Sequence, residues 1–246
     1  MNSSIRKKLI ALHYKKQSIH LGSSLSCIDI ISSILLELKI PFRDFILSKG
    51  HASTALYVCL NELGVISNSL LDSYYENGTH LTAHPIFESG FVDFSTGSLG
   101  HGISLAAGKC MARKFQEVEA PVFCLVSDGE MNEGSVYEGI NFAVQHKLNN
   151  LYVIVDNNGF QGLGHGSEVL GDLTQTFATR KGLNYIEIDG HNSSEIKIAL
   201  NCTSSYPTLI NAKTIKGKGV DFAENDNNWH YNKLSREQYH NALSKL

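Results

Sequence analysis

This sequence lacks two features: an excess of basic residues and long hydrophobic runs. Its 21 Lys and Arg residues are outnumbered by 24 Asp and Glu residues, so the formal net charge is -3 at pH 7. Such a chain has no basic surface field with which to attract nucleic acid. No apolar run reaches the roughly 20 residues that a transmembrane helix requires, and the basic N-terminal segment lacks the apolar core of a signal peptide. We therefore expect neither a nucleic-acid partner nor a membrane.

Cysteine is also infrequent, and its spacing follows no binding pattern. The five cysteines form no CxxC pair, and most of them lie in apolar runs, which predicts buried, reduced thiols and a cytoplasmic protein. Internal repeats and low-complexity linkers are absent from the sequence. With 42% hydrophobic and 18% charged residues, the composition is that of a globular chain, and we expect a single domain over residues 1–246.

Hydrophobic periodicity predicts alternating helices and strands. Apolar residues recur at helical spacing over residues 5–12, 27–38, 52–63, 103–111 and 136–148. Short apolar runs of strand length occupy residues 45–47, 121–126, 151–156, 184–189 and 207–214. Continuous apolar strands that alternate with helices predict an α/β fold, a doubly wound and mostly parallel sheet with helices on both faces. Ligands of such sheets bind at the carboxyl ends of the strands.

Polar residues and glycines follow several of these strands. The run "VSDGEMNEG" brings Asp128 and Gly129 to the end of one strand, and Asn158 follows the next. A carboxylate and an amide oxygen suit Mg²⁺, which would let phosphate oxygens approach the carboxylate, and Gly129 lets a ligand come close to the backbone. Each residue also has a simpler interpretation, Asp128 as a helix cap and Asn158 as a turn residue. We interpret Glu130 as a solvated residue in the first turn of the next helix.

Six segments, in order, resemble transketolases, which use thiamine diphosphate. Asp128-Gly129 and Asn158 resemble the diphosphate-binding motif of thiamine-diphosphate enzymes. The other matching segments are "SIHLGSSLSCIDI" with His20, "LSKGHASTALY" with His51, "HPIFESGFVDFSTGSLGHG" with His84, Gly97 and Leu99, "DGHN", and "AKTIKGKG" followed by "WH" with His230. Together they span nearly the whole chain.

The resemblance implies a cofactor, a metal and roles for particular residues. It implies thiamine diphosphate and a divalent cation, Mg²⁺ or another such as Ca²⁺ or Mn²⁺. The implied metal ligands are Asp128, Asn158 and the backbone carbonyl of Phe160. The implied cofactor contacts are His51, Gly97, Leu99, Gly129 and His230, and the implied catalytic residues are His20, His51, His84, His230 and Glu133. Glu133, one turn into the helix, would meet its counterpart across a subunit interface.

The resemblance covers the diphosphate-binding part of a transketolase and implies a partner. Family enzymes carry a pyrimidine-binding domain and a C-terminal domain besides this one. We therefore expect the N-terminal subunit of a split transketolase. Such an enzyme is a transferase of the EC 2.2.1 class that moves a two-carbon ketol unit from a ketose to an aldose. A second, C-terminal subunit would carry the pyrimidine-binding domain, in an α2β2 assembly acting on sugars or sugar phosphates.

Some alternatives and departures from the family pattern stay open. The alternatives are a 1-deoxyxylulose-5-phosphate-synthase-like condensation and a non-catalytic, regulatory subunit. Simple Rossmann nucleotide binding fails because no G-x-G-x-x-G follows the first strand. Ser127 replaces the first glycine of GDG, and His101 replaces a usual Gln. Gly162 stands where a bulky aliphatic residue often packs, a role that Leu163 could take. The departures suggest an unusual sugar substrate.

Overall fold

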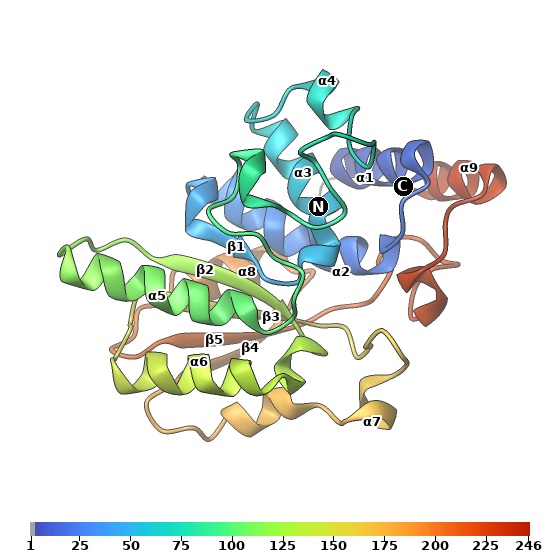
Figure 1. Cartoon of the computed structure of the whole chain (residues 1–246). Coiled ribbons are helices and arrows are strands. Elements are labelled where there is room, and N and C mark those ends of the chain that lie inside the picture. The colour runs from blue at the N-terminus through green and yellow to red at the C-terminus, as the bar shows by residue number, and fades with distance from the viewer. Residues whose placement is uncertain (1–2) are drawn as a thin grey trace.

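The computed structural model describes residues 3–246 and assembles the expected strands into one sheet (Figure 1). The strands are β1 (Phe45–Leu47), β2 (Val122–Ser127), β3 (Leu151–Asn157), β4 (Asn184–Asp189) and β5 (Thr208–Lys213). The helices are α1 (Ser3–Lys16), α2 (Leu21–Ser32), α3 (Ser53–Glu62), α4 (Asn68–Leu71), α5 (His101–Phe115), α6 (Gly134–Gln145), α7 (Gly166–Val169), α8 (Ser193–Leu200) and α9 (Arg236–Lys245). A π-helical turn, Ser33–Glu37, continues α2, and short 3-10 turns include Glu130–Asn132 and Asn227–His230.

The sheet is parallel throughout and has the order β1-β2-β3-β5-β4. Each strand lies within one residue of its predicted bounds, and the α/β fold class is confirmed. Every residue of β2 and β3 is buried, as expected for strands covered on both faces. Successive side chains of β2 point to opposite sides: Phe123 and Leu125 join one core cluster, whereas Cys124 and Val126 join the other.

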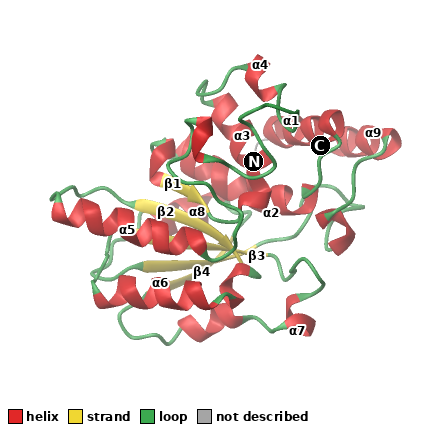
Figure 2. Ribbon diagram, viewed as in Figure 1, coloured by secondary structure: helices red, strands yellow, loops and turns green. Residues whose placement is uncertain are grey.

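Helices cover both faces of the sheet (Figure 2). Helices α1, α2, α3 and α8 contribute to the larger core cluster, and α5 and α6 contribute to the smaller one. All five cysteines are free thiols, and four of them are buried, as predicted. Among residues 3–246, no helix has both the length and the apolar character needed to cross a membrane.

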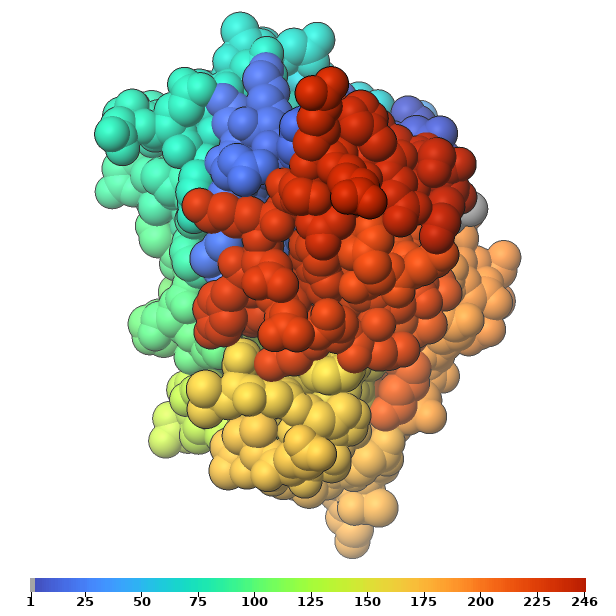
Figure 3. Space-filling model, turned by 90° about the vertical axis from the view of Figure 1, so that its right-hand side faces the viewer, coloured from blue at the N-terminus to red at the C-terminus, as the bar shows by residue number. Residues whose placement is uncertain are grey.

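The parallel arrangement brings the strand ends to one edge. In the β2–β3 pairing Ser127 lies opposite Asp156, and in the β3–β5 pairing Asn157 lies opposite Lys213. The segments that leave β2, β3 and β5 therefore start at the same level. At this edge the C-terminal segment, red in Figure 3, lies directly against the yellow segment that follows β3.

Candidate functional site

A cavity of about 350 Å³ lies at the carboxyl edge of the sheet. All of the predicted site residues except Asp128 line it: His20, His51, His84, Gly97, Leu99, Gly129, Glu133, Asn158, Phe160 and His230. These residues come from loops that are far apart in the sequence. The structure therefore brings the predicted set together at one place, while their individual roles stay predictions.

Four imidazoles form a cluster on one wall of the cavity. The ring centroid of His20 lies 5.4 Å from that of His51, 5.9 Å from that of His84 and 4.9 Å from that of His230. His20 precedes α2 in a left-handed backbone conformation (φ 69°), and its N–H donates to the His230 carbonyl at 3.0 Å. This bond fixes the two loops that carry the rings.

The imidazole cluster is electrically neutral near pH 7. Burial lowers the pKa of His20 to about 4, helped by His84 and by two lysines. Burial and then Lys216 lower the pKa of His230 to about 3. The pKa values of His51 and His84 are also lowered, mainly by burial. Neutral imidazole both donates and accepts hydrogen bonds, so this wall suits a ligand rich in hydroxyl and carbonyl groups.

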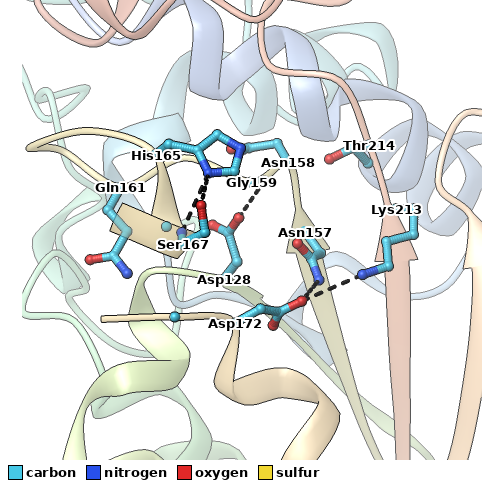
Figure 4. A pocket seen from close by; sticks show the side chains of 12 residues that line it. Asp128, Asn157, Asn158, Gly159, Gln161, His165, Ser167, Asp172, Lys213 and Thr214 are labelled. Atoms are coloured by element: carbon cyan, nitrogen blue, oxygen red, sulfur yellow. Dashed lines mark hydrogen bonds and ion pairs between the residues drawn. The ribbon is translucent and has the colours of Figure 1, made fainter. Parts of the chain in front are cut away.

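Asp128 and Asn158 meet where the loops after β2 and β3 touch (Figure 4). Asp128 Oδ2 accepts a hydrogen bond from Gly159 N at 2.6 Å, and Oδ1 accepts from Gly129 N at 2.8 Å. Asn158 Oδ1 accepts from Phe160 N at 3.0 Å. Asp128 and Asn158 share the lining of a second cavity of about 330 Å³. Burial, and next the charge of Asp156, raises the pKa of Asp128 to about 7, although Lys49 acts in the opposite direction. Within residues 3–246 Asp128 forms no salt bridge.

The chemistry of these donors fits a cation that also has ligands of its own. No group of three or more His, Cys, Asp or Glu side chains within residues 3–246 could hold a metal ion. The predicted set offers one carboxylate, one amide oxygen and one backbone carbonyl. Mg²⁺ prefers such oxygen donors and completes its shell with phosphate oxygens and water. The residues present therefore fit a metal that arrives with a diphosphate.

Lys216 is a site residue that the sequence did not single out. Its side chain is 1% exposed, and its Nζ donates to Asn227 Oδ1 at 2.6 Å. The Nζ also lies 3.5 Å from His230 Nδ1 and 5.4 Å from the centre of the Phe160 ring. Burial, and next Lys49, lowers its pKa to about 8. No carboxylate within residues 3–246 pairs with it. Lys216 lies behind His230 and Phe160, which line the cavity, so its charge makes that wall more favourable for an anion.

A buried ion pair, also unpredicted, reaches the cavity wall, which Lys49 helps to line. Lys49 and Asp156 are both fully buried and pair with each other. Lys49 Nζ also donates to the Ser23 carbonyl at 3.2 Å, and Ser26 Oγ donates to Asp156 Oδ2 at 2.5 Å. Because every charge here has a partner, the pair is stable only in this geometry. It fixes α2 and the loop after β1 to the end of β3.

The interpretation of Glu130 as a solvated helix residue is wrong. Glu130 is fully buried, and it accepts hydrogen bonds from the Ser48 hydroxyl, from Gly100 N at 2.7 Å and from Ser127 N at 3.3 Å. Three donors compensate for burying a carboxylate. Glu130 thus holds the loop that carries Gly97 and Leu99 against the end of β2.

The next residues also differ from expectation. Glu133 does not lie one turn into the helix; it is the N-cap of α6, and it is exposed at the cavity rim. Asn132 lines the same cavity, and neither its side-chain nitrogen nor its side-chain oxygen has a hydrogen-bond partner among residues 3–246. Buried polar groups are rarely left unpaired, so Asn132 marks a place where a polar ligand is expected.

Three departures from the family pattern now have a structural explanation or a correction. Ser127 is not among the residues with positive φ, and its Oγ accepts from Glu130 N at 3.1 Å, so serine fits there. His101 is exposed at the start of α5. Leu163, which the sequence offered as a replacement for the side chain missing at Gly162, is 89% exposed and is not among the residues that line the cavity.

The comparisons with known proteins agree on one family. The family model described as "Transketolase, thiamine diphosphate binding domain" matches residues 9–246. The chain is 33% identical to one subunit of the apulose-4-phosphate transketolase of Phocaeicola vulgatus, over 98% of this chain and 90% of that protein. It is 34% identical to a 6-deoxy-6-sulfo-D-fructose transketolase subunit of Clostridium sp. (strain MSTE9), over 92% of this chain and 88% of that protein.

A solved structure shows the same fold within a longer chain. The transketolase of Campylobacter jejuni superposes with a TM-score of 0.85 at 27% identity. The match covers 99% of this chain and 43% of that chain. The chain therefore corresponds in length to the separate subunits, and to less than half of the one-chain enzyme.

Proposed function

We propose that this chain, which belongs to the transketolase family, is the thiamine diphosphate-binding subunit of a two-chain transketolase. The proposed reaction transfers a two-carbon ketol unit from a ketose or ketose phosphate to an aldose. Similarity over nearly the whole length of relatives that are named as single subunits of transketolases supports the two-chain arrangement. A synthase-like condensation is not favoured, because the relatives described above are named transketolases.

One observation carries the proposal. Asp128 contacts the backbone next to Asn158, so a carboxylate and an amide from two neighbouring loops lie beside one cavity wall. The same wall region adjoins the imidazole cluster and the buried cation of Lys216. A metal ion with a diphosphate complements a site in which a carboxylate and a lysine lie near the same cavity.

Particular residues would hold the cofactor and the metal. Asp128, Asn158 and the Phe160 carbonyl would bind Mg²⁺, and Lys216 would neutralise a diphosphate oxygen together with the Gly129 N–H. When bound, thiamine diphosphate supplies a thiazolium carbon nucleophile, which is chemistry that no side chain offers. Gly97 and Leu99 would border the aminopyrimidine ring. His51 and His230, which line the same cavity, would contact diphosphate oxygens.

The imidazoles would bind the substrate and exchange protons with it. Because they are neutral near pH 7, His20, His51, His84 and His230 would donate protons to, or accept them from, the carbonyl and hydroxyl oxygens of a sugar. A non-catalytic subunit would need no such cluster of four rings. The cavity wall thus supports a catalytic subunit over a regulatory one.

The second subunit would close the site. Glu133 and the apolar side chains of Leu99 and Leu170 are exposed at the cavity, where a pyrimidine-binding domain would cover them. We propose an α2β2 assembly in which Glu133 meets its counterpart across the interface. We also propose a cytoplasmic location, since the free cysteines suit a reducing compartment.

Calorimetry and activity of the assembled enzyme test the proposal. The chain is co-purified with the product of a neighbouring reading frame that encodes a pyrimidine-binding domain, and Mg²⁺ with thiamine diphosphate is titrated into the complex. D-xylulose 5-phosphate, apulose 4-phosphate and 6-deoxy-6-sulfofructose are then offered as donors, with D-ribose 5-phosphate as acceptor. We expect cofactor binding that Asp128→Ala abolishes, and preferential turnover of one donor. A complex that binds no thiamine diphosphate would refute the proposal.

A further inference from the structure

The loop after β3 and the turn at the end of Asn227–His230 meet in the wall of the cavity. Asn227 Nδ2 donates to the Gly162 carbonyl at 3.3 Å. A Cβ atom added at Gly162 would lie 3.3 Å from the hydroxyl oxygen of Tyr231 and 3.9 Å from His230 Nε2. In Figure 3 the red and yellow segments that carry these residues are in contact. A larger side chain at position 162 would therefore press on the Tyr231 hydroxyl and displace it by a few tenths of an ångström.

Space, and not backbone conformation, explains the glycine. Gly162 is not among the glycines with positive φ, so its backbone would accept other residues. A contact of 3.3 Å is tighter than ordinary van der Waals contact, so Tyr231 would have to move if position 162 carried a methyl group. Gly164, two residues on, is a useful contrast, because its added Cβ would meet only Val169 Cγ2, at an ordinary 3.8 Å.

Tyr231 presents a free hydroxyl beside the imidazoles. Its ring packs edge-on against His230, with centroids 4.7 Å apart, and lies 6.3 Å from the ring of His20. The side chain is 59% exposed, and its hydroxyl makes no hydrogen bond with any residue in the described range. An aromatic ring held by a neighbour, with an unused hydroxyl at a cavity wall, is suited to contact a ligand that is partly apolar and partly polar.

We propose that Tyr231 determines substrate specificity, by contacting the sugar, and that Gly162 provides the room for its hydroxyl. This inference rests on the proposed transketolase function. A ketose has C–H faces that pack on an aromatic ring and hydroxyl oxygens that accept a phenol hydrogen bond. Tyr231 lines the cavity and is exposed, whereas Lys216 is buried behind the cavity wall. We therefore assign the tyrosine to the sugar and not to the diphosphate.

Steady-state kinetics of the assembled two-chain enzyme test this role. The donors are D-xylulose 5-phosphate, apulose 4-phosphate and 6-deoxy-6-sulfofructose, with D-ribose 5-phosphate as acceptor. Loss of one hydrogen bond in Tyr231→Phe should raise the donor KM about threefold to tenfold while kcat changes less than about twofold. Tyr231→Ala should raise the KM further, since the ring contact is lost too. The dissociation constant of thiamine diphosphate should stay unchanged in both variants.

A double-mutant cycle isolates the contact between the two residues. Gly162→Ala should raise the donor KM in the wild-type background, and it should do so much less in the Tyr231→Phe background, which lacks the oxygen that the methyl group meets. Gly164→Ala is the matched control and should leave the KM as it is. Equal effects of Gly162→Ala in both backgrounds would overturn the contact.

Other outcomes separate this inference from the function on which it rests. A wild-type enzyme that binds the cofactor and turns over a donor, with a donor KM that Tyr231→Ala leaves unchanged, overturns the role of Tyr231 alone. Weaker assembly of the two chains at unchanged KM would assign the ring to the partner interface, and weaker cofactor binding would assign it to the cofactor; either result overturns the proposal. An assembled wild-type enzyme that turns over none of the donors refutes the transketolase function as well.

Discussion

Replacing Asp128 with asparagine should make the cofactor-free chain more stable and unable to hold its cofactor. Asp128 forms no salt bridge within residues 3–246. Two backbone N–H groups donate to it, and the unfavourable charge of Asp156 acts on it more strongly than the favourable charge of Lys49. Asparagine keeps the size of the side chain and removes the charge. The Asp128→Asn variant therefore separates what this group does for folding from what it does for binding.

The pKa of Asp128 gives the size of the effect. Burial, and next Asp156, raises this pKa from 3.8 to about 7. Protonated Asp128 therefore contributes its full stabilisation below pH 3.8. This contribution to the free energy of unfolding decreases as the pH rises and is lost above about pH 7. At about 1.4 kcal/mol per pH unit, the loss is about 4 kcal/mol. The asparagine forfeits one of the two hydrogen bonds from backbone N–H groups, which costs about 1 kcal/mol. We expect a net gain of about 3 kcal/mol at pH 8 and less than about 1 kcal/mol at pH 5.

Urea denaturation of the cofactor-free chain at a fixed protein concentration measures this difference. The buried histidines also contribute to the pH dependence: burial lowers the pKa of His13 and of His20 to about 4, so their stability contribution is lost as the pH falls below 6.5. That loss occurs in both proteins and cancels in the comparison. Asp221→Asn, at a side chain that is 69% exposed, controls for the change in net charge.

Calorimetry with Mg²⁺ and thiamine diphosphate completes the experiment. The variant should show no binding at cofactor concentrations that saturate the wild type. A stability difference that is the same at pH 5 and pH 8 would show that Asp128 is not held in an unfavourable ionised state. A variant that binds the cofactor as tightly as the wild type would refute the metal-ligand role of Asp128.

Three further predictions concern the cavity. Lys216→Gln should weaken cofactor binding about 10-fold to 100-fold, the value of a buried charge-assisted hydrogen bond, whereas Lys218→Gln should leave it unchanged; equal effects in calorimetry would contradict the assignment. Mg²⁺ alone should bind with a dissociation constant above about 1 mM, because the protein supplies too few ligands. Tight Mg²⁺ binding without cofactor in calorimetry would show that the protein forms a complete metal site by itself. Gly97→Ala should destabilise the chain by about 1–3 kcal/mol and raise the donor KM, because φ is 138° and the new Cβ would lie 2.9 Å from His84 Cδ2; unchanged urea midpoints and KM would disprove the strain.

Local sequence patterns were sufficient for the strands and for the motif residues. Strand β4 has the predicted bounds, and the run 45–47 is β1, because continuous apolar runs between helices have one common use in an α/β protein. Asp128, Asn158 and the four site histidines were found because each lies in a recognisable short segment. These signals depend on residues close together in the chain.

The remaining features depend on contacts between distant segments. Glu130 is buried because Ser48 and Gly100 donate to it, and no pattern around Glu130 shows that. The segment "KGKG" contains two lysines, and only the folded path shows which of them is inside. Lys216 is buried, whereas Lys218 Nζ lies 3.7 Å from Glu224 Oε1 at the surface. Spacing alone cannot tell which of two neighbouring side chains faces a cavity.

The charges of the site explain why its ligand should carry both signs. Lys49 and Asp156 neutralise each other, whereas Asp128 and Lys216 are left without partners and have pKa values of about 7 and about 8. A bare diphosphate would meet the lysines but also the two carboxylates, and a bare Mg²⁺ would meet the carboxylates but also the lysines. A magnesium diphosphate would bring a cation to Asp128 and an anion towards Lys216, so each of these charges would gain a partner at once. Binding of metal and cofactor should therefore be mutually dependent, and the free energy that the ionised Asp128 costs the empty fold is recovered only when both are present.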